Sequence, residues 1–254
     1  MHMDNVKISR VLFELSNVNR IRILESLQEG EMTLRDFSLK TGIPKPELSR
    51  NLKRLVSSGI IIRKGTNEYT LSPLGRILML HLKNLNFLEK FAFIFMEHDL
   101  SFLPMEFQLT LGDLENIKVV EGTIEGFNLT VDRLNVAESY ENIMTREILL
   151  PFIEPVKRLL EKNLKVKLIA PRNTGSEIMK LLEGVKVKNI RIKLVEDVQM
   201  VILADANTAE FNLPLLKGDL DYGITFYSDE ERGVGWINRL FYYYWESLPG
   251  EMIL

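Results

Sequence analysis

The sequence predicts an α+β winged helix-turn-helix domain, then a long helix, then an α/β domain whose sheet is mainly parallel. Three observations predict this order. Short helical patterns with capping residues come first and end in two strand-like segments. A longer helical pattern begins at Pro73, and from about Ser101 segments rich in Val, Ile and Leu alternate with helices. We therefore divide the chain into residues 1–72, 73–97 and 98–254.

Composition places the chain among ordinary globular proteins, with 254 residues, 46% of them hydrophobic and 26% charged. It contains no cysteine, which excludes disulfides and thiolate metal sites, and we expect neither a metal nor a cofactor. The N-terminus lacks the apolar core of a signal peptide, and the apolar run Phe91–Met96 is too short to cross a bilayer. We expect a cytoplasmic protein without a membrane partner.

Charge is distributed unevenly along the chain. Residues 1–96 carry 15 Lys and Arg against 9 Asp and Glu, whereas residues 97–254 carry 17 against 26. Such asymmetry favours a part that binds a polyanion joined to a part that does not. Chance variation in surface charge is the alternative at this point.

Capping residues and apolar spacing define the first three helices. One is expected over Asp4–Leu15, and Asn19 is the expected N-cap of the next. Thr33 is the expected cap of the third, which Gly42 ends. Their core positions recur at helical spacing: Ile21, Ile23, Leu24, Leu27, Leu34, Phe37 and Leu39.

The fourth helix follows the turn GIP and is expected to read DNA. Pro46 suits its first position and Lys45, which precedes a proline, is its expected cap. A buried stripe is predicted at Leu48, Leu52, Leu55 and Val56. Gly59 ends the helix, and IIIRK and YTLSP form two strands around the turn GTNE. Short helices followed by a hairpin make a winged helix-turn-helix domain, whose second motif helix enters the major groove.

Cationic and polar side chains on this helix and on the wing are the candidate DNA contacts. Arg50 and Lys53 suit guanine O6 and N7, and Ser49 suits a base or a phosphate. Cations on the wing suit phosphates, whose neutralisation releases counterions. Simple solvation of an exposed helix is the alternative. The candidate residues are Lys45, Ser49, Arg50, Lys53, Arg54, Arg63, Lys64, Thr66 and Asn67.

The block NRIRILESL…TLRDFSLKTGIPKPELSRNLKRLVSSGIIIRKGTNEYTLSPLG resembles the winged-helix repressors of the arsenical-resistance type, over about residues 8–78. The resemblance implies a dimeric transcriptional regulator that binds double-stranded DNA. Metal-sensing members of that family carry a Cys motif near the recognition region. This chain has no cysteine, so the resemblance does not extend to metal sensing.

The segment from Pro73 to about Glu97 is predicted to be one helix with a heptad seam. The seam comprises Leu74, Leu78, His81, Leu85, Leu88, Ala92 and Phe95. It predicts a homodimer formed through residues 73–97, although a helix packed on its own domain is the alternative. His81 and Lys83 also begin the H-x-K-x4-D signature of phospholipase-D-type phosphodiesterases, but its aspartate position is Leu88.

The remaining chain alternates strands and helices. Expected strands are NIMTREI, KVKLIAP, IRIKLVED, VQMVILAD, TAEFNLPL and ITFYSD. Helical patterns cover LPMEFQLTLGDLENIK, GFNLTVDRLNVAESY, the segment from Pro151, NTGSEIMKLLEG and GVGWINRLFYYYWESL. This alternation predicts a mainly parallel sheet with an antiparallel edge.

Polar residues follow two of these strands, where ligands of open α/β sheets bind. They are candidates for a small anionic effector, although capping of the next helix is the alternative for the second group. The candidates are Thr145, Arg146, Arg172, Asn173, Thr174 and Ser176.

Residues 98–247 resemble the middle domain of archaeal methanogenesis-regulatory proteins, on the segments HDLSFLP, LGDLE, KVKLIAP, EDVQMVILADA and GWINRLFYYYW. The sheet pattern is also similar to half of a phospholipase-D-like fold, as in some archaeal sugar-responsive regulators. Together with the N-terminal block, the resemblance implies an archaeal transcriptional regulator with an effector or assembly domain.

The predicted function is therefore a dimeric, sequence-specific DNA-binding transcriptional regulator, and not an enzyme. Its C-terminal domain senses a small molecule or mediates assembly. Two alternatives remain at this stage. One is a phosphodiesterase-like enzyme with a nucleic-acid-binding arm, and the other is a protein-interaction module.

Overall fold

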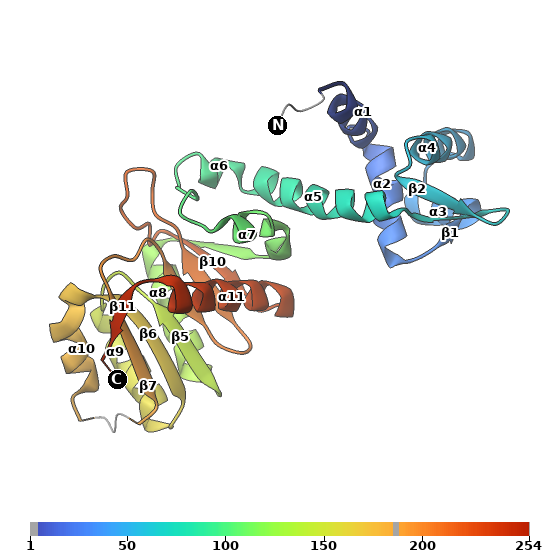
Figure 1. Cartoon of the computed structure of the whole chain (residues 1–254). Helices are drawn as coiled ribbons and strands as arrows, with labels where there is room; N and C mark the ends of the chain where they lie inside the picture. Colours follow the sequence, from blue (N-terminus) through green and yellow to red (C-terminus); the bar gives the residue numbers. More distant parts are fainter. Residues whose placement is uncertain (1–4, 185–187, 254) are drawn as a thin grey trace. The chain divides into compact units, whose positions relative to one another are not determined.

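The chain forms two compact units, over residues 1–83 and 84–254 (Figure 1). The structure, a computed structural model, describes residues 5–184 and 188–253. The boundary between the units lies inside a helix, whereas the sequence-based division placed boundaries at 72 and 97. That three-part division stays a prediction.

Helices followed by a hairpin build the N-terminal unit, so the predicted winged helix-turn-helix fold is confirmed. Strand β1, which the sequence pattern did not predict, joins the hairpin and gives the order β1-β3-β2. The elements are α1 (Asn5–Leu15), α2 (Val18–Ser26), the 3-10 turn η1 (Leu27–Glu29), β1 (Met32–Thr33), α3 (Leu34–Thr41), α4 (Lys45–Ser57), β2 (Ile61–Lys64) and β3 (Glu68–Leu71).

Side-chain caps set the starts of α2 and α3. The Asn17 side chain accepts a hydrogen bond from the Arg20 amide at 3.1 Å and is the N-cap of α2. The prediction of Asn19 as that cap is wrong, because Asn19 lies inside the helix. Thr33 caps α3 as predicted, and Asp36 completes a capping box.

Helix α4 begins at Lys45, so the predicted cap at that residue is wrong. Pro44, with φ −58° and ψ 137°, is the last non-helical residue. Pro46 lies in the first turn of the helix, where a proline is tolerated, so the helix can begin before it. The predicted core residues Leu48, Leu52 and Leu55 are buried. The fourth predicted core residue, Val56, is 37% exposed. Asn51, which was not predicted to be in the core, is buried.

The predicted helix 73–97 is broken near its end. Helix α5 spans Pro73–Lys90 and crosses the boundary between the units. Phe91 leaves helical geometry, with φ −112° and ψ 16°, and a short α6 (Ala92–Phe95) follows. Within the described residues, no helix is long and apolar enough to cross a membrane.

Among the described residues, a single sheet of eight strands organises the C-terminal unit, in the order β11-β7-β6-β5-β8-β9-β10-β4 (Figure 1). Two edge strands were not predicted: β4 follows directly on a helical pattern, and β11 pairs with β7 at the end of the chain. The strands are β4 (Lys118–Glu121), β5 (Tyr140–Met144), β6 (Lys165–Pro171), β7 (Ile190–Val195), β8 (Val201–Ala204), β9 (Ala209–Asn212), β10 (Ile224–Ser228) and β11 (Gly250–Met252).

The sheet is mixed, which corrects the prediction of a mainly parallel one. Only β5, β6 and β7 are parallel neighbours, and the other pairs are antiparallel. Helices α9 and α10 connect the three parallel strands, as a parallel crossover requires. Strands β8, β9 and β10 follow one another without a helix; β9 pairs antiparallel with β8, and β10 with β9.

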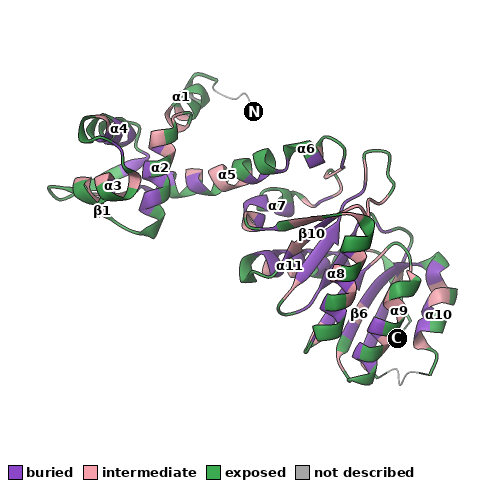
Figure 2. Ribbon diagram, turned by 180° about the vertical axis from the view of Figure 1, so that it is seen from behind, coloured by how far each residue is buried: buried purple, intermediate pink, exposed green. Residues whose placement is uncertain are grey.

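Helices cover both faces of this sheet (Figures 1 and 2). On one face lie α8 (Thr123–Val136), α9 (Leu150–Glu161) and α10 (Gly175–Leu182), which form one hydrophobic core with alternate residues of the strands. On the other lies α11 (Glu231–Ser247), whose core also includes α5 from Phe87, α6, α7 (Met105–Gln108) and the 3-10 turn η2 (Leu111–Leu114).

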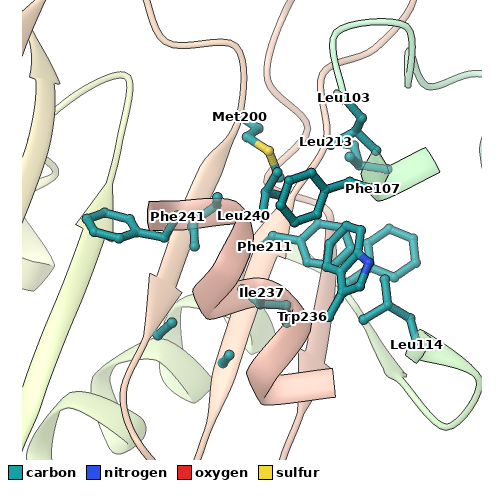
Figure 3. Close-up of a cluster of buried hydrophobic side chains, with 14 of the residues drawn as sticks. Leu103, Phe107, Leu114, Met200, Phe211, Leu213, Trp236, Ile237, Leu240 and Phe241 are labelled. Atoms are coloured by element: carbon teal, nitrogen blue, oxygen red, sulfur yellow. The ribbon is translucent and has the colours of Figure 1, made fainter. Parts of the chain in front are cut away.

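Trp236 lies at the centre of the α11 core and is fully buried (Figure 3). The ring of Phe107 meets it edge-on with centroids 5.3 Å apart, and its indole NH donates to Thr110 Oγ1 at 3.0 Å. Aromatic packing with a satisfied indole NH is a stabilising arrangement. The predicted aromatic helix is thus a core element.

A buried ionic cluster joins α8 to the middle of the sheet. Arg133 contacts Glu141 on β5, Asp205 after β8 at 3.3 Å and Glu210 on β9 at 3.6 Å. Thr130 donates to Glu210 at 2.6 Å. One cation therefore faces three carboxylates away from water, and burial of unbalanced charge is costly. Protonation of a carboxylate relieves this imbalance.

Burial raises the pKa of Glu141 to about 8 from its ordinary value of 4.5, and it raises the pKa of Glu210 as well. Between pH 4.5 and about pH 8 the folded chain therefore holds a proton on Glu141 that the unfolded chain has released. The resulting stabilisation is present in full below pH 4.5 and is lost as the pH rises through 8.

We therefore expect the free energy of unfolding of the C-terminal unit to fall as the pH rises from about 5.5 to about 8.5, by at most about 1.4 kcal/mol per pH unit for this proton. Glu141→Gln removes the proton equilibrium and should flatten the fall. Urea unfolding followed by tryptophan fluorescence measures it, since Trp236 and Trp245 both lie in this unit. Exposed Glu138→Gln is the control. A fall of unchanged slope in Glu141→Gln contradicts the assignment.

Candidate nucleic-acid interface

The turn between α3 and α4 fixes which side of α4 faces outward. Gly42 has φ 67°, a left-handed conformation that glycine adopts readily, and its NH bonds the Ser38 carbonyl. Phe37 from α3 and Leu48 and Leu52 from α4 are buried in one core. Burial of these side chains leaves the opposite side of α4 exposed.

The exposed side of α4 carries a stripe of four predicted DNA contacts. Lys45, Ser49 and Lys53 are four residues apart and therefore lie along one line of the helix, and Arg50 lies beside them. All four are exposed, and none of their side chains forms an ion pair or hydrogen bond with the residues that the structure describes. This cationic stripe, defined by these four residues, is available to a phosphate or a base edge.

Arg54 differs from the stripe, because it is already paired. Its guanidinium donates to both carboxylate oxygens of Glu14 on α1, at 3.2 and 2.7 Å, and lies 5.0 Å from the Phe13 ring. The hydrogen bond from Arg54 holds the pKa of the Glu14 carboxylate below its ordinary value. Arg54 thus fastens α1 to α4, and its predicted DNA contact stays a prediction.

The wing between β2 and β3 presents the other predicted contacts, all exposed. Gly65 makes the turn with φ 56°. Lys64 pairs with Glu31, and Arg63 donates to the Thr66 carbonyl. The side chains of Thr66 and Asn67 stay exposed at the tip. The wing therefore presents two exposed polar side chains, Thr66 and Asn67, and two cations, Arg63 and Lys64, that already have partners.

Two acidic residues at or near α4 are engaged by side chains of other helices, which the sequence did not reveal. Glu47, the one acid of α4, accepts a hydrogen bond from Asn19 at 2.7 Å. Glu14 is occupied by Arg54 and also pairs with Arg20 at 3.3 Å. An acidic residue in the first turn of α4 was visible in the sequence, but its partner on α2 was not.

The candidate effector residues mostly contact backbone carbonyls or acidic side chains of the same unit. Thr145 donates to the Glu147 carbonyl at 2.7 Å, and Arg146 to the Gly218 carbonyl at 2.7 Å. Arg172 pairs with Glu196 at 3.1 Å and with Glu251 at 3.0 Å, which ties the end of β6 to β11.

Two of the three remaining candidates beyond β6 form hydrogen bonds with residues close to them in the sequence. Thr174 is buried and donates to the Pro171 carbonyl at 2.7 Å, whereas Ser176 donates to Glu177 at 2.8 Å. Asn173 is exposed. A cavity of about 50 Å³ between α9 and the face of the sheet includes Thr145 in a mostly apolar lining, and none of the four candidates beyond β6 lines it. These positions stay a prediction.

Comparisons with known proteins give a family match within the N-terminal unit and matches to solved structures over parts or most of the chain. Residues 17–63 match the profile of a family described as "Bacterial regulatory protein, arsR family". The chain has no significant match among curated proteins. It is similar to the structure of TrmBL2, an archaeal chromatin protein, with 15% identity over 92% of this chain and 94% of that chain and a TM-score of 0.43.

Two further solved structures match parts of the chain. Reduced HlyU from Vibrio cholerae is 27% identical over 31% of this chain and 88% of its own, with a TM-score of 0.28. Nuc, a phospholipase D family member from Salmonella typhimurium, is 11% identical over 54% of this chain and 99% of its own, with a TM-score of 0.41.

The matched profile covers α2, α3, α4 and most of β2, the elements that build the helix-turn-helix motif. It agrees with the expected resemblance to arsenical-resistance repressors. The chain is a DNA-binding transcriptional regulator with a winged helix-turn-helix domain. The resemblance of residues 98–247 to methanogenesis-regulatory proteins has no counterpart among these matches and stays a prediction.

Replacement of both Arg50 and Lys53 by alanine should weaken duplex binding by about 1–3 kcal/mol or more and lower the slope of log affinity against log salt by about 1 or more. The reason is the loss of two unpaired cations from the stripe. Fluorescence anisotropy with labelled duplex measures both quantities.

Arg22→Ala is the matched control for that experiment. Arg22 is exposed on α2 beside Glu25 and Glu29, in surroundings unsuited to a phosphate. Its loss should leave the affinity and the salt slope unchanged. Equal losses in both variants would contradict a DNA contact by the stripe.

Proposed function

We propose that the chain is a sequence-specific regulator that binds duplex DNA as a homodimer in the cytoplasm. Its C-terminal unit senses a small molecule or mediates assembly. The observation that carries DNA recognition is the cationic stripe of α4, exposed and without side-chain partners among the described residues. A helix of this kind fits the major groove, where Arg50 and Lys53 match guanine edges.

Selection from a pool of randomised duplexes at two salt concentrations tests sequence-specific binding. An enriched motif with two-fold symmetry at both concentrations supports a specific dimer, because the symmetry of a site mirrors that of its protein. Salt-sensitive binding without an enriched motif would overturn sequence specificity and leave a phosphate anchor.

Dimerisation is proposed through α5 because its apolar residues are not all used by the chain's own cores. Of the predicted seam, Leu74, Leu85 and Leu88 are exposed, whereas Leu78 is half-buried. Ile77 and Leu80 add further exposed apolar surface, at 54% and 63%. A contiguous apolar strip on a soluble helix indicates an interface.

The C-terminal unit is proposed to act through α5, which belongs to both units. In a dimer, a change in the C-terminal unit that alters α5 would alter the separation of the two α4 helices and hence the affinity for two half-sites. Such coupling requires an effector that binds one arrangement better than the other.

We propose no catalytic reaction for this unit or for α5. The phosphodiesterase signature begins at the exposed His81 on α5 and lacks its aspartate, since position 88 is leucine. His98 is buried, with its ring nitrogens 2.7 Å from the Ile94 carbonyl and 2.9 Å from Asp221. These contacts tie α6 to the segment before β10.

Replacement of both Ile77 and Leu85 by glutamate should convert the dimer into a monomer, because two charges per chain would enter an apolar interface. Sedimentation velocity measures the mass, with twice the chain mass expected for the native protein. Leu150→Glu, at a leucine that is 77% exposed on α9, is the control and should leave the dimer intact. A dimer that survives the double substitution, or a monomeric native chain, refutes this interface.

A further inference from the structure

A hollow of about 670 Å³ lies at the amino ends of β5, β6 and β7. These strands extend past α11 at that end (Figure 1). Four cations and two tyrosines line the hollow, together with two amides and two aliphatic residues, and no carboxylate of the described residues lines it. The cations and tyrosines are Lys165, Lys167, Lys188, Arg191, Tyr140 and Tyr242. Its volume is within the range of small-molecule sites.

Strand register places the polar residues in two rows on one face. Asn142, Lys167 and Arg191 are direct neighbours across the three strands, and Tyr140 and Lys165 form the next row. Neighbouring strands are about 5 Å apart, and residues two positions apart are about 7 Å apart along a strand. The patch therefore has the dimensions of a small molecule.

The row on the other side of Lys167 shows why the patch is polar. Met144 and Ile169 occupy that row under α11 and are buried in its core. Lys193 completes the row and donates to the Trp245 carbonyl near the end of α11 at 2.6 Å. Core packing by α11 thus stops one row before Lys167, and the cations begin where it stops.

Lys167 is held in position by aromatic rings. Its Nζ lies 4.3 Å from the centroid of Tyr242 and 5.3 Å from that of Trp245. The half-buried ammonium therefore points at the side of the hollow lined by α11. Tyr242 presents an additional planar surface there and is 37% exposed.

The hollow is lined by cations although the part of the chain around it carries more acidic than basic residues. Residues 97–254 contain 26 acids against 17 Lys and Arg, yet none of the four lining cations pairs with a carboxylate of the described chain. Like charges gathered without counterions repel one another, and a bound anion relieves that repulsion. Lys and Arg together are typical ligands of phosphate groups.

We propose that this hollow binds a nucleotide, with its phosphates on Lys165, Lys167 and Arg191 and its planar base against Tyr242. Where the C-terminal unit acts as a sensor, a role that rests on the proposed function, this nucleotide is the effector. The site lies at the opposite ends of the strands from the residues that the sequence predicted for an anion.

Calorimetric titration of the full chain without DNA tests the site, so a failure of DNA regulation leaves the result unaffected. The probes are adenosine diphosphate and inorganic pyrophosphate. We expect one saturable site per chain for both, with the nucleotide bound more tightly because only it carries a base. Combined Lys165→Gln and Arg191→Gln should weaken both by about tenfold or more. Both residues are exposed, so folding should be retained.

Lys180→Gln is the matched control, because Lys180 is exposed on α10 away from the hollow and should leave binding unchanged. Absence of saturable binding by both probes overturns the proposal. So does an equal loss in the control, which would indicate a general charge effect. Tighter binding of a single-stranded oligonucleotide than of adenosine diphosphate would overturn the small-molecule assignment.

Discussion

Burial of one side of α4 is the constraint on which DNA recognition depends. Leu48, Leu52 and Leu55 are 0%, 1% and 0% exposed and leave the helix no freedom to rotate about its axis. Each of these side chains contributes roughly 1.5–3 kcal/mol by burial, far more than an exposed ion pair. The orientation of the cationic stripe therefore follows from apolar packing, and the charges need no partner of their own to hold them outward.

Much of the N-terminal unit could be predicted from the sequence, because its decisive signals are local. Helical spacing, the Thr33 cap and Gly42 all act within a few residues; the cap and the glycine were confirmed, whereas the predicted core positions Leu39 and Val56 are exposed. The Glu14–Arg54 pair could not be predicted, since its partners are 40 residues apart. The sequence presents Arg54 as one more cation of the helix, and only the fold shows that it is engaged.

Less of the C-terminal unit could be predicted, because strand partners depend on contacts distant in sequence. Six of the eight described strands were found as segments, but β8 inserts beside β5 and gives the sheet its antiparallel half. The cationic hollow was missed for the same reason. Lys167 and Arg191 belong to different strands, and nothing in the sequence indicates that they share a row. Conversely, Arg172 looked available for a ligand, although Glu196 and Glu251 occupy it.

Affinity cleavage from position 49 tests most directly whether two α4 helices enter the major groove. The chain has no cysteine, so Ser49→Cys gives a single thiol for an iron chelate. On the selected duplex, we expect two cleavage centres about one helical turn apart, or a multiple of it, each centred on a major groove. One centre, or cleavage spread evenly along the duplex, would contradict recognition by a pair of α4 helices.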